Sequence, residues 1–187
     1  MNIQFGKNDL KMFLNYVKKS SIYFEYGIGG STCEVIKYDN LKKIYSIESD
    51  YRWCEKVLKI IKKNEKINIK LVDLKCKENS WGYPSNHCSY TKMKEYSDQI
   101  KLIDERPDLI LIDGRFRVCC CLKAFDYIDN KTLIAFDDFV MRKHYHEVLK
   151  YYDIIKKTID NRMVILRKKN NISIPKKIIE KYELDPR

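Results

Sequence analysis

Acidic side chains stand at or near the carboxyl ends of five apolar segments of this chain. They are Glu25, Glu48, Asp73, Asp113 and the pair Asp137 and Asp138. If the segments are parallel strands, a single edge of a sheet collects all of these carboxylates. Carboxylates placed there can accept hydrogen bonds from hydroxyl groups and favour a positively charged ligand. Acids repeated at one edge are hard to explain as surface residues that only contact solvent, so this edge is the predicted functional site.

A glycine-rich loop follows the first of these segments. The apolar, β-prone run 22–26 leads into Gly27-Ile28-Gly29-Gly30, and Ser31-Thr32 then begin a helix that extends to Ile36. Glycine lets the backbone approach a ligand closely, and the start of a helix offers unpaired N–H groups and a partial positive charge. The loop therefore predicts a nucleotide-like ligand, although a glycine cluster alone also marks ordinary turns.

Glu48 strengthens the prediction of a nucleotide-like ligand. It ends the apolar run 43–48 and lies 19 residues after Gly29. At this distance, an acid at the tip of the second strand can accept hydrogen bonds from both hydroxyls of a ribose. The alternative is a surface acid at the end of a strand.

The elements that must position these residues alternate along the chain. Strands are expected at 22–26, 43–48, 67–72, 108–113 and 132–136, and helices at 7–19, 31–36, 51–63, 118–128 and 141–152. Strands at 152–159 and 163–166 are expected to form a late hairpin across Asp160-Asn161. Such alternation predicts a three-layer α/β/α, Rossmann-like fold whose sheet is mostly parallel with an antiparallel late strand. We expect one domain over 1–187, with an N-terminal helix at 7–19, a core at 20–168 and a polar tail at 170–187 that holds a short helix.

Composition excludes several classes of protein. The chain has 187 residues, of which 44% are apolar and 34% charged, and no apolar run approaches the roughly 20 residues that span a bilayer. We expect a soluble, intracellular (cytoplasmic) protein without a membrane partner. Seven cysteines, three of them consecutive at Cys119-Cys120-Cys121, do not make a disulfide framework, and we interpret them as core residues.

The formal net charge of +11 raises the possibility of a nucleic-acid partner. The lysines are scattered through the whole chain, however, and Lys, Ile, Asn and Tyr are heavily used together, a bias typical of AT-rich coding. Nucleic acid therefore remains an alternative partner.

Over residues 20–168 the chain resembles the class I S-adenosylmethionine-dependent methyltransferases. Glu25-Tyr26-Gly27-Ile28-Gly29-Gly30 looks like their glycine motif, Glu48 like their ribose-binding acid and Asp113 like their fourth-strand motif. The resemblance implies that S-adenosyl-L-methionine binds at the glycine loop and its helix start, at the acids of the second and fourth strands, and after the third strand. These positions are Glu25, Tyr26, Gly27, Gly29, Gly30, Ser31, Thr32, Glu48, Ser49, Asp73 and Asp113.

A nicotinamide dinucleotide is the rival cofactor for such a loop. A dehydrogenase normally adds a second half-fold for the nicotinamide, whereas this chain resembles the methyltransferases in its late strand pair. S-adenosylmethionine also carries a cationic sulfonium and ammonium, which suit a rim of carboxylates better than a pyrophosphate does.

The resemblance also implies candidate catalytic residues. Asp113, Asp137 and Asp138 look like the acids by which cation-dependent O-methyltransferases hold Mg²⁺ or Mn²⁺, but the pair is Asp-Asp and Phe116 stands where those enzymes have a lysine base. Asp138 as a helix cap and Asp113 as a contact of the cofactor alone are the alternatives. Either His144 or His146 can serve as a general base, and on a helix only one of them is expected to reach the site.

The acceptor side is predicted from aromatic and basic residues. Trp81 and Tyr83 lie in the irregular stretch 75–91, which could hold a sugar or simply pack on the core. Arg115 and Arg117 could bind a phosphate or nucleotide-sugar acceptor, or pair with Asp104 or Glu105. The order of motifs is similar to that of methyltransferase-like proteins of bacteria and large DNA viruses, for which a sugar or glycan acceptor and O-methyl transfer are our hypothesis. An RNA methyltransferase and a catalytically inactive cofactor-binding module are the alternatives, and the oligomeric state stays open.

Overall fold

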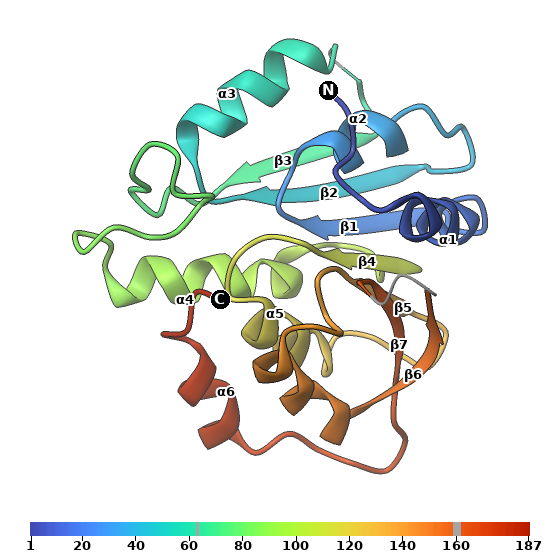
Figure 1. Cartoon of the computed structure of the whole chain (residues 1–187), viewed down its shortest axis with the longest axis vertical. Helices are drawn as coiled ribbons and strands as arrows, with labels where there is room; N and C mark the ends of the chain where they lie inside the picture. The colour runs from blue at the N-terminus through green and yellow to red at the C-terminus, as the bar shows by residue number, and fades with distance from the viewer. Residues whose placement is uncertain (63, 159–161) are drawn as a thin grey trace.

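The computed structural model describes residues 1–62, 64–158 and 162–187. Seven strands form one sheet in the order β3-β2-β1-β4-β5-β7-β6 (Figure 1). The strands are β1 (Ile22–Tyr26), β2 (Lys43–Glu48), β3 (Ile67–Leu71), β4 (Leu109–Ile112), β5 (Leu133–Phe136), β6 (Tyr152–Lys157) and β7 (Val164–Lys168). The first five are parallel, while β7 is antiparallel to both β5 and β6, which confirms the predicted fold class.

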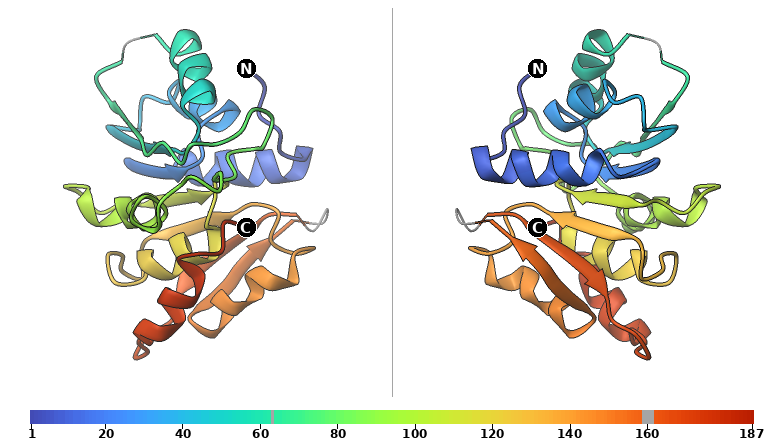
Figure 2. Two further views of the ribbon diagram at one scale, coloured as in Figure 1. Left: turned by 90° about the vertical axis from the view of Figure 1, so that its left-hand side faces the viewer. Right: turned by 90° about the vertical axis from the view of Figure 1, so that its right-hand side faces the viewer.

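Helices cover both faces of the sheet (Figure 2). They are α1 (Lys7–Val17), α2 (Gly30–Val35), α3 (Tyr51–Ile60), α4 (Tyr90–Asp98), η1 (Gln99–Leu102), α5 (Arg117–Ala124), η2 (Lys143–Lys150) and α6 (Lys176–Tyr182). The side chains of β4 show why two layers are needed, because Leu109 and Leu111 pack in one apolar cluster with α1 while Ile110 and Ile112 pack in another with α4 and α5. All four are buried, as expected for a central parallel strand.

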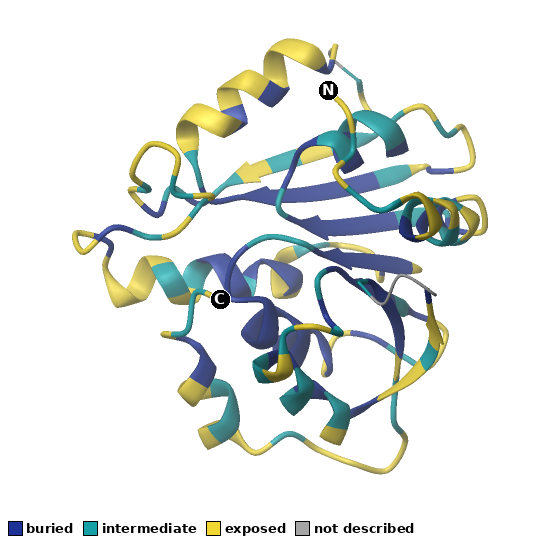
Figure 3. Cartoon of the chain, viewed as in Figure 1, coloured by how far each residue is buried: buried dark blue, intermediate teal, exposed yellow. Residues whose placement is uncertain are grey.

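Burial decreases from the centre of the sheet to its edges (Figure 3). β1 and β4 are buried, whereas β6 and the outer side of α3 are largely exposed. Cys119, Cys120 and Cys121 are fully buried in α5 as free thiols, which confirms that they are core residues. No helix in the described part of the chain is long and apolar enough to cross a membrane.

Several predicted elements need correction. The helix expected at 141–152 is shorter, spanning 143–150, and it is the 3-10 helix η2, in which the buried Tyr145 and Val148 repeat every three residues as that helix requires. Helix α4 was not predicted at all. Helices α1, α3 and α5 end earlier than expected, at Val17, Ile60 and Ala124. The predicted turn Asp160-Asn161 and the ends of the elements expected at 152–159 and 51–63 lie outside the described residues.

Candidate cofactor and acceptor site

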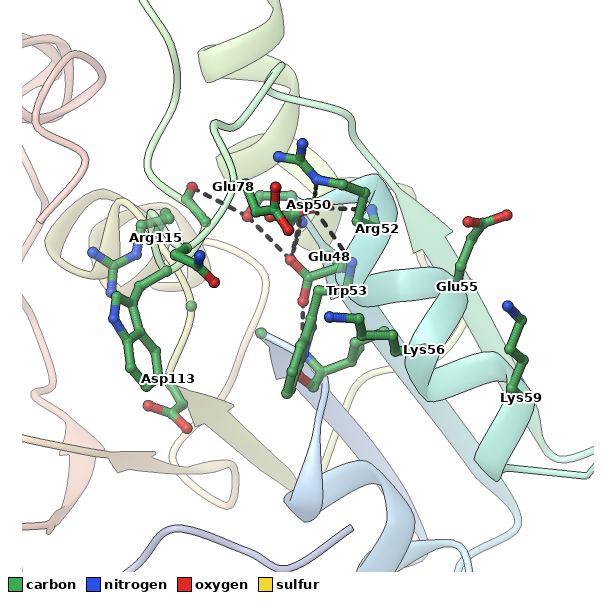
Figure 4. Close-up of a pocket in the computed structure, with 17 residues that line it drawn as sticks. Glu48, Asp50, Arg52, Trp53, Glu55, Lys56, Lys59, Glu78, Asp113 and Arg115 are labelled. Atoms are coloured by element: carbon green, nitrogen blue, oxygen red, sulfur yellow. Dashed lines mark hydrogen bonds and ion pairs between the residues drawn. The ribbon is translucent and has the colours of Figure 1, made fainter.

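A cavity of about 570 Å³ opens at the carboxyl edge of the sheet, where β1, β2 and β4 end (Figure 4). Its volume falls in the range of small-molecule sites, roughly 300–1,000 Å³. Glu48 and Trp53 lie in the middle of the pocket, with Asp113 and Arg115 at one end and Lys59 at the other. The loop after β1, the helix α3 and the loop after β4 therefore meet around one space, as the strand order requires.

Glu48 joins the cavity to the glycine loop. One carboxylate oxygen accepts the N–H of Ile28 at 3.1 Å, and the other accepts the N–H groups of Ser49 at 2.6 Å and Asp50 at 2.8 Å. Burial raises the pKa of this carboxyl group, while these backbone hydrogen bonds oppose the rise. The side chain that was predicted to bind ribose thus lines the cavity in a fixed orientation, held by backbone donors.

Gly27 and Gly114 bring two loops into direct contact. Gly27 has a φ of +90°, and a Cβ atom there would lie 2.8 Å from the Cα of Gly114. At Gly114, a Cβ atom would overlap the hydroxyl of Tyr96. Both positions therefore require glycine, the first for its backbone angle and both for space. Gly114 was not singled out from the sequence, although it follows a strand-end acid much as Gly27 does.

Glu25 does not line the cavity but lies beneath the glycine loop, fully buried. It accepts hydrogen bonds from the hydroxyls of Tyr23 at 3.0 Å, Ser31 at 2.9 Å, Thr32 at 2.6 Å and Ser46 at 2.7 Å. Ser31 and Thr32 therefore point to Glu25 rather than to a ligand. In this arrangement Glu25 positions the start of α2, and its assignment as a direct cofactor contact stays a prediction.

The buried Glu25 carboxyl group should make stability depend on pH. Burial raises its pKa from 4.5 to about 6, so the native state binds this proton more tightly than the unfolded state does. The resulting contribution is fully present below pH 4.5 and is lost as the pH rises through about 6. Urea unfolding from pH 4 to 8 should show the stability of the wild type falling by about 2 kcal/mol relative to Glu25→Gln. An equal stability difference between wild type and Glu25→Gln at pH 4 and pH 8 would contradict the assignment.

Three carboxylates and three guanidinium groups meet where β4 and β5 end. They belong to Asp113, Asp137, Asp138, Arg117, Arg142 and Arg162. Asp138 pairs with Arg142 and Arg162, each at 2.7 Å, and with Arg117 at 3.5 Å. The acids predicted to hold a metal ion are thus already paired with cations from the same chain.

Asp137 completes this cluster as a carboxyl group with a raised pKa. Burial, with the neighbouring Asp113 and Asp138 carboxylates, raises the pKa of Asp137 to about 7. A protonated Asp137 can donate the hydrogen bond that it shares with Asp113. Asp113 also accepts from Arg117 at 3.0 Å, and Arg117 further donates to the carbonyl oxygens of Gly114 and Asp137, each at 2.9 Å. When Asp137 is protonated, three guanidinium groups face two carboxylates, so the cluster holds more positive than negative charge.

These residues do not fit a divalent cation. Mg²⁺ and Mn²⁺ need oxygen ligands whose negative charge is free to balance the ion. Here arginines already balance the charge of the carboxylates. In residues 1–62, 64–158 and 162–187 no group of three or more His, Cys, Asp or Glu side chains is arranged to hold a metal ion. The prediction of a metal site at Asp113, Asp137 and Asp138 is therefore not supported by their surroundings.

Divalent cations should accordingly leave the stability of the protein unchanged. We expect the Tm in EDTA to equal the Tm with added Mg²⁺ or Mn²⁺, because the guanidinium groups already occupy the carboxylates. Differential scanning fluorimetry checks this. Arg162→Met removes one guanidinium group from Asp138 and should lower the Tm. A rise in Tm with metal for this variant alone would support the conclusion that the arginines occupy the carboxylates. A rise for the wild type would contradict it.

The two histidines predicted as general bases lie within η2 and do not line the cavity. His146 stacks on Phe139, with ring centroids 5.0 Å apart, and its Nε2 atom lies 3.2 Å from the carbonyl oxygen of Phe139. Burial and the nearby Arg187 lower the pKa of His144. Neither ring is brought to the acids of the cavity, and their catalytic role stays a prediction.

The remaining predicted residues divide into two groups. Of these, Ser49 and Trp81 line the cavity, and Trp81 is 88% exposed. Tyr26, Gly29, Gly30, Asp73, Tyr83 and Arg117 do not line it. Tyr26 turns into the core and donates to the carbonyl of Ser97, and a Cβ at Gly30 would overlap the backbone of the N-terminal segment. Arg117 pairs with Asp113 and Asp138 instead of Asp104 or Glu105.

Sequence reasoning missed one residue at the centre of the cavity. Trp53, in the first turn of α3, donates its indole N–H to the carbonyl of Ile28 at 2.7 Å and lines the pocket beside Glu48. Asp50 accepts the N–H of Arg52 and so caps this helix. The signal was present as a tryptophan five residues after the strand-end acid.

Comparisons with known proteins define the fold. No family model matches the sequence, and no curated protein matches it. A methyltransferase-like protein from Silicibacter pomeroyi DSS-3 matches in structure with a TM-score of 0.83 at 21% identity, over 99% of this chain and 98% of that chain. The chain has the class I methyltransferase fold. Its sheet order and antiparallel β7 belong to this fold.

Two further solved structures with the methyltransferase fold contain a cofactor or its product. The N-methyltransferase NodS from Bradyrhizobium japonicum WM9, in complex with S-adenosyl-L-homocysteine, matches with a TM-score of 0.55 at 11% identity, over 87% of this chain and 85% of that chain. Fibrillarin from Aeropyrum pernix, with natively bound S-adenosyl-L-methionine, matches with a TM-score of 0.54 at 12% identity, over 82% and 68%. At these identities the likeness concerns the methyltransferase fold alone.

Proposed function

We propose that this chain is a S-adenosylmethionine-dependent O-methyltransferase that acts on a hydroxyl group of a sugar or glycan. The observation that carries the methyltransferase part is the position of Glu48, which lines the cavity while its carboxylate holds the N–H of Ile28 in the glycine loop. The fold neighbours that contain S-adenosylmethionine or its product add support.

The residues of the cavity fit such a cofactor. Glu48 can accept hydrogen bonds from ribose hydroxyls, and Trp53 offers a flat ring beside it. Asp113 adds a second carboxylate to the lining of the cavity, where Arg117 already shares its charge. When bound, the cofactor would supply an electrophilic methyl group.

The chain's own residues would then orient the acceptor and take up a proton. Of the four predicted catalytic residues, Asp113 lines the cavity and the other three do not. Burial raises the pKa of Asp113, which brings a carboxylate closer to the range in which it can accept a proton from a hydroxyl group. Trp81, exposed at the cavity, offers a surface on which the apolar face of a sugar ring can pack.

Isothermal titration tests the cofactor. S-adenosylhomocysteine should bind with a stoichiometry of one, and NAD should not bind; binding of NAD alone would end the proposal.

The acceptor is tested by release of S-adenosylhomocysteine from S-adenosylmethionine in the presence of mono- and disaccharides. Release with RNA, with a steep loss of RNA binding as salt rises, would support the RNA alternative that the net charge of +11 keeps open. Cofactor binding without release by any acceptor would indicate a binding module.

A further inference from the structure

Arg115 is a buried arginine whose guanidinium group lacks an acidic partner. The residue is only 7% exposed and lines the cavity. Its guanidinium carbon lies 4.5 Å from the centre of the Tyr83 ring, so the group stacks on an aromatic face. Its backbone N–H faces the hydroxyl of Tyr96 at 3.4 Å, which fixes the start of the side chain.

Two other buried cations, Arg117 and Lys123, are paired. Arg117 contacts the carboxylates of Asp113 and Asp138, and Lys123 contacts those of Asp98 and Glu183 at 2.8 Å each. Within the part of the chain that the structure describes, Arg115 forms no ion pair and its guanidinium donates no hydrogen bond. The guanidinium N–H groups of Arg115 are not sealed inside the protein but remain open to the cavity, so a ligand there can accept their hydrogen bonds.

The surroundings of Arg115 favour a negatively charged guest. Gly82 packs against it, because a Cβ at Gly82 would lie 3.6 Å from the Cγ of Arg115. Asp113, at the same end of the pocket, is already held by Arg117 and so does not neutralise Arg115. A planar guanidinium fork with unused N–H groups matches a carboxylate or a phosphate in two parallel hydrogen bonds.

We infer that Arg115, stacked on Tyr83, binds an oxyanion of the molecule that enters the cavity. Two sources supply this chemistry, namely the carboxylate of the cofactor's amino-acid part and a carboxylate or phosphate carried by the acceptor. The inference deepens the proposed function, since it adds a charge requirement to the same site.

Titration of the wild type and Arg115→Gln distinguishes the two sources. The probes are S-adenosylhomocysteine, 5′-methylthioadenosine, which lacks the carboxylate, and inorganic phosphate added to the protein loaded with S-adenosylhomocysteine. Loss of about tenfold or more in affinity for S-adenosylhomocysteine, without loss for 5′-methylthioadenosine, assigns Arg115 to the cofactor. Unchanged affinity for S-adenosylhomocysteine with loss of phosphate binding assigns it to the acceptor.

Two outcomes would overturn the inference. One is equal loss for S-adenosylhomocysteine and 5′-methylthioadenosine, and the other is no effect of the substitution on any probe. Arg115→Lys keeps the charge without the planar fork and should recover only part of the affinity. Arg167→Gln is the matched control, because Arg167 is exposed and lies opposite Leu133, the first residue of β5, far from the carboxyl ends of the parallel strands. Thermal unfolding of each variant shows whether it is folded. If the wild type binds phosphate but not S-adenosylhomocysteine, the proposed function fails while the oxyanion site stands.

Discussion

Gly27→Ala is expected to abolish binding of S-adenosylhomocysteine and to destabilise the protein. Alanine at a φ of +90° costs about 1–2 kcal/mol, and its Cβ would lie 2.8 Å from backbone atoms of Gly114, an overlap that adds about 1–3 kcal/mol. The backbone around Gly114 is held in place, because the next residue, Arg115, donates its N–H to the buried Tyr96 hydroxyl. Urea unfolding should give a loss of about 2–5 kcal/mol, and titration should detect no binding.

Gly29→Ala is the matched control for stability in the same loop. Gly29 has a φ of 165°, which is extended backbone, and a Cβ there would meet the Trp53 ring at an ordinary 3.6 Å. We expect its stability to stay within about 1 kcal/mol of the wild type. Equal destabilisation by the two substitutions would show that contact with Gly114 is not what makes Gly27 necessary.

Glu48→Gln is expected to weaken binding of S-adenosylhomocysteine about 10- to 100-fold. A hydrogen bond to a charged carboxylate contributes about 1.5–3 kcal/mol, and glutamine has one acceptor oxygen where Glu48 uses two. The amide NH₂ would also face a backbone N–H of Ile28 or Ser49. The affinity loss therefore combines a missing ligand contact with a displaced glycine loop, and isothermal titration measures it.

Glu55→Gln separates this effect from a general change of charge in the cavity. Glu55 lines the same cavity from α3, but its carboxylate accepts from Tyr51 at 2.7 Å and contacts neither loop nor strand. Its affinity for S-adenosylhomocysteine should stay within about twofold of the wild type. If both substitutions weaken binding equally, Glu48 acts through charge alone and its predicted contact with ribose is wrong.

Local patterns were enough to predict the sheet. Strands β1, β2 and β4 are apolar runs that end in turn or acidic residues, and their parallel pairing follows from the helices between them. Helix α4 was missed because its polar sequence buries only Tyr96 and Ser97, which leaves no apolar repeat to detect. The strength of a pattern, rather than the length of an element, decided what could be predicted.

The edge of the sheet at which strand-end acids gather was predicted in position but not in charge. Strand-end acids do meet there, and Glu48 and Asp113 line the cavity as expected. The arginines that pair with Asp138 come from positions 117, 142 and 162, which only the folded chain brings together. The fully buried Glu25 could not be distinguished from Glu48, because both look like acids at the end of a strand. Formal charges read along a sequence therefore overestimate how acidic such an edge is.

The contact between Gly27 and Gly114 has a consequence for redesign. The loops after β1 and β4 touch backbone to backbone, with no side chain between them to absorb a change in either. A new acceptor loop grafted between β4 and α5 must keep glycine at position 114, or it will shift the segment that follows β1. The loops after β1 and β4 are therefore best replaced together, as a matched pair.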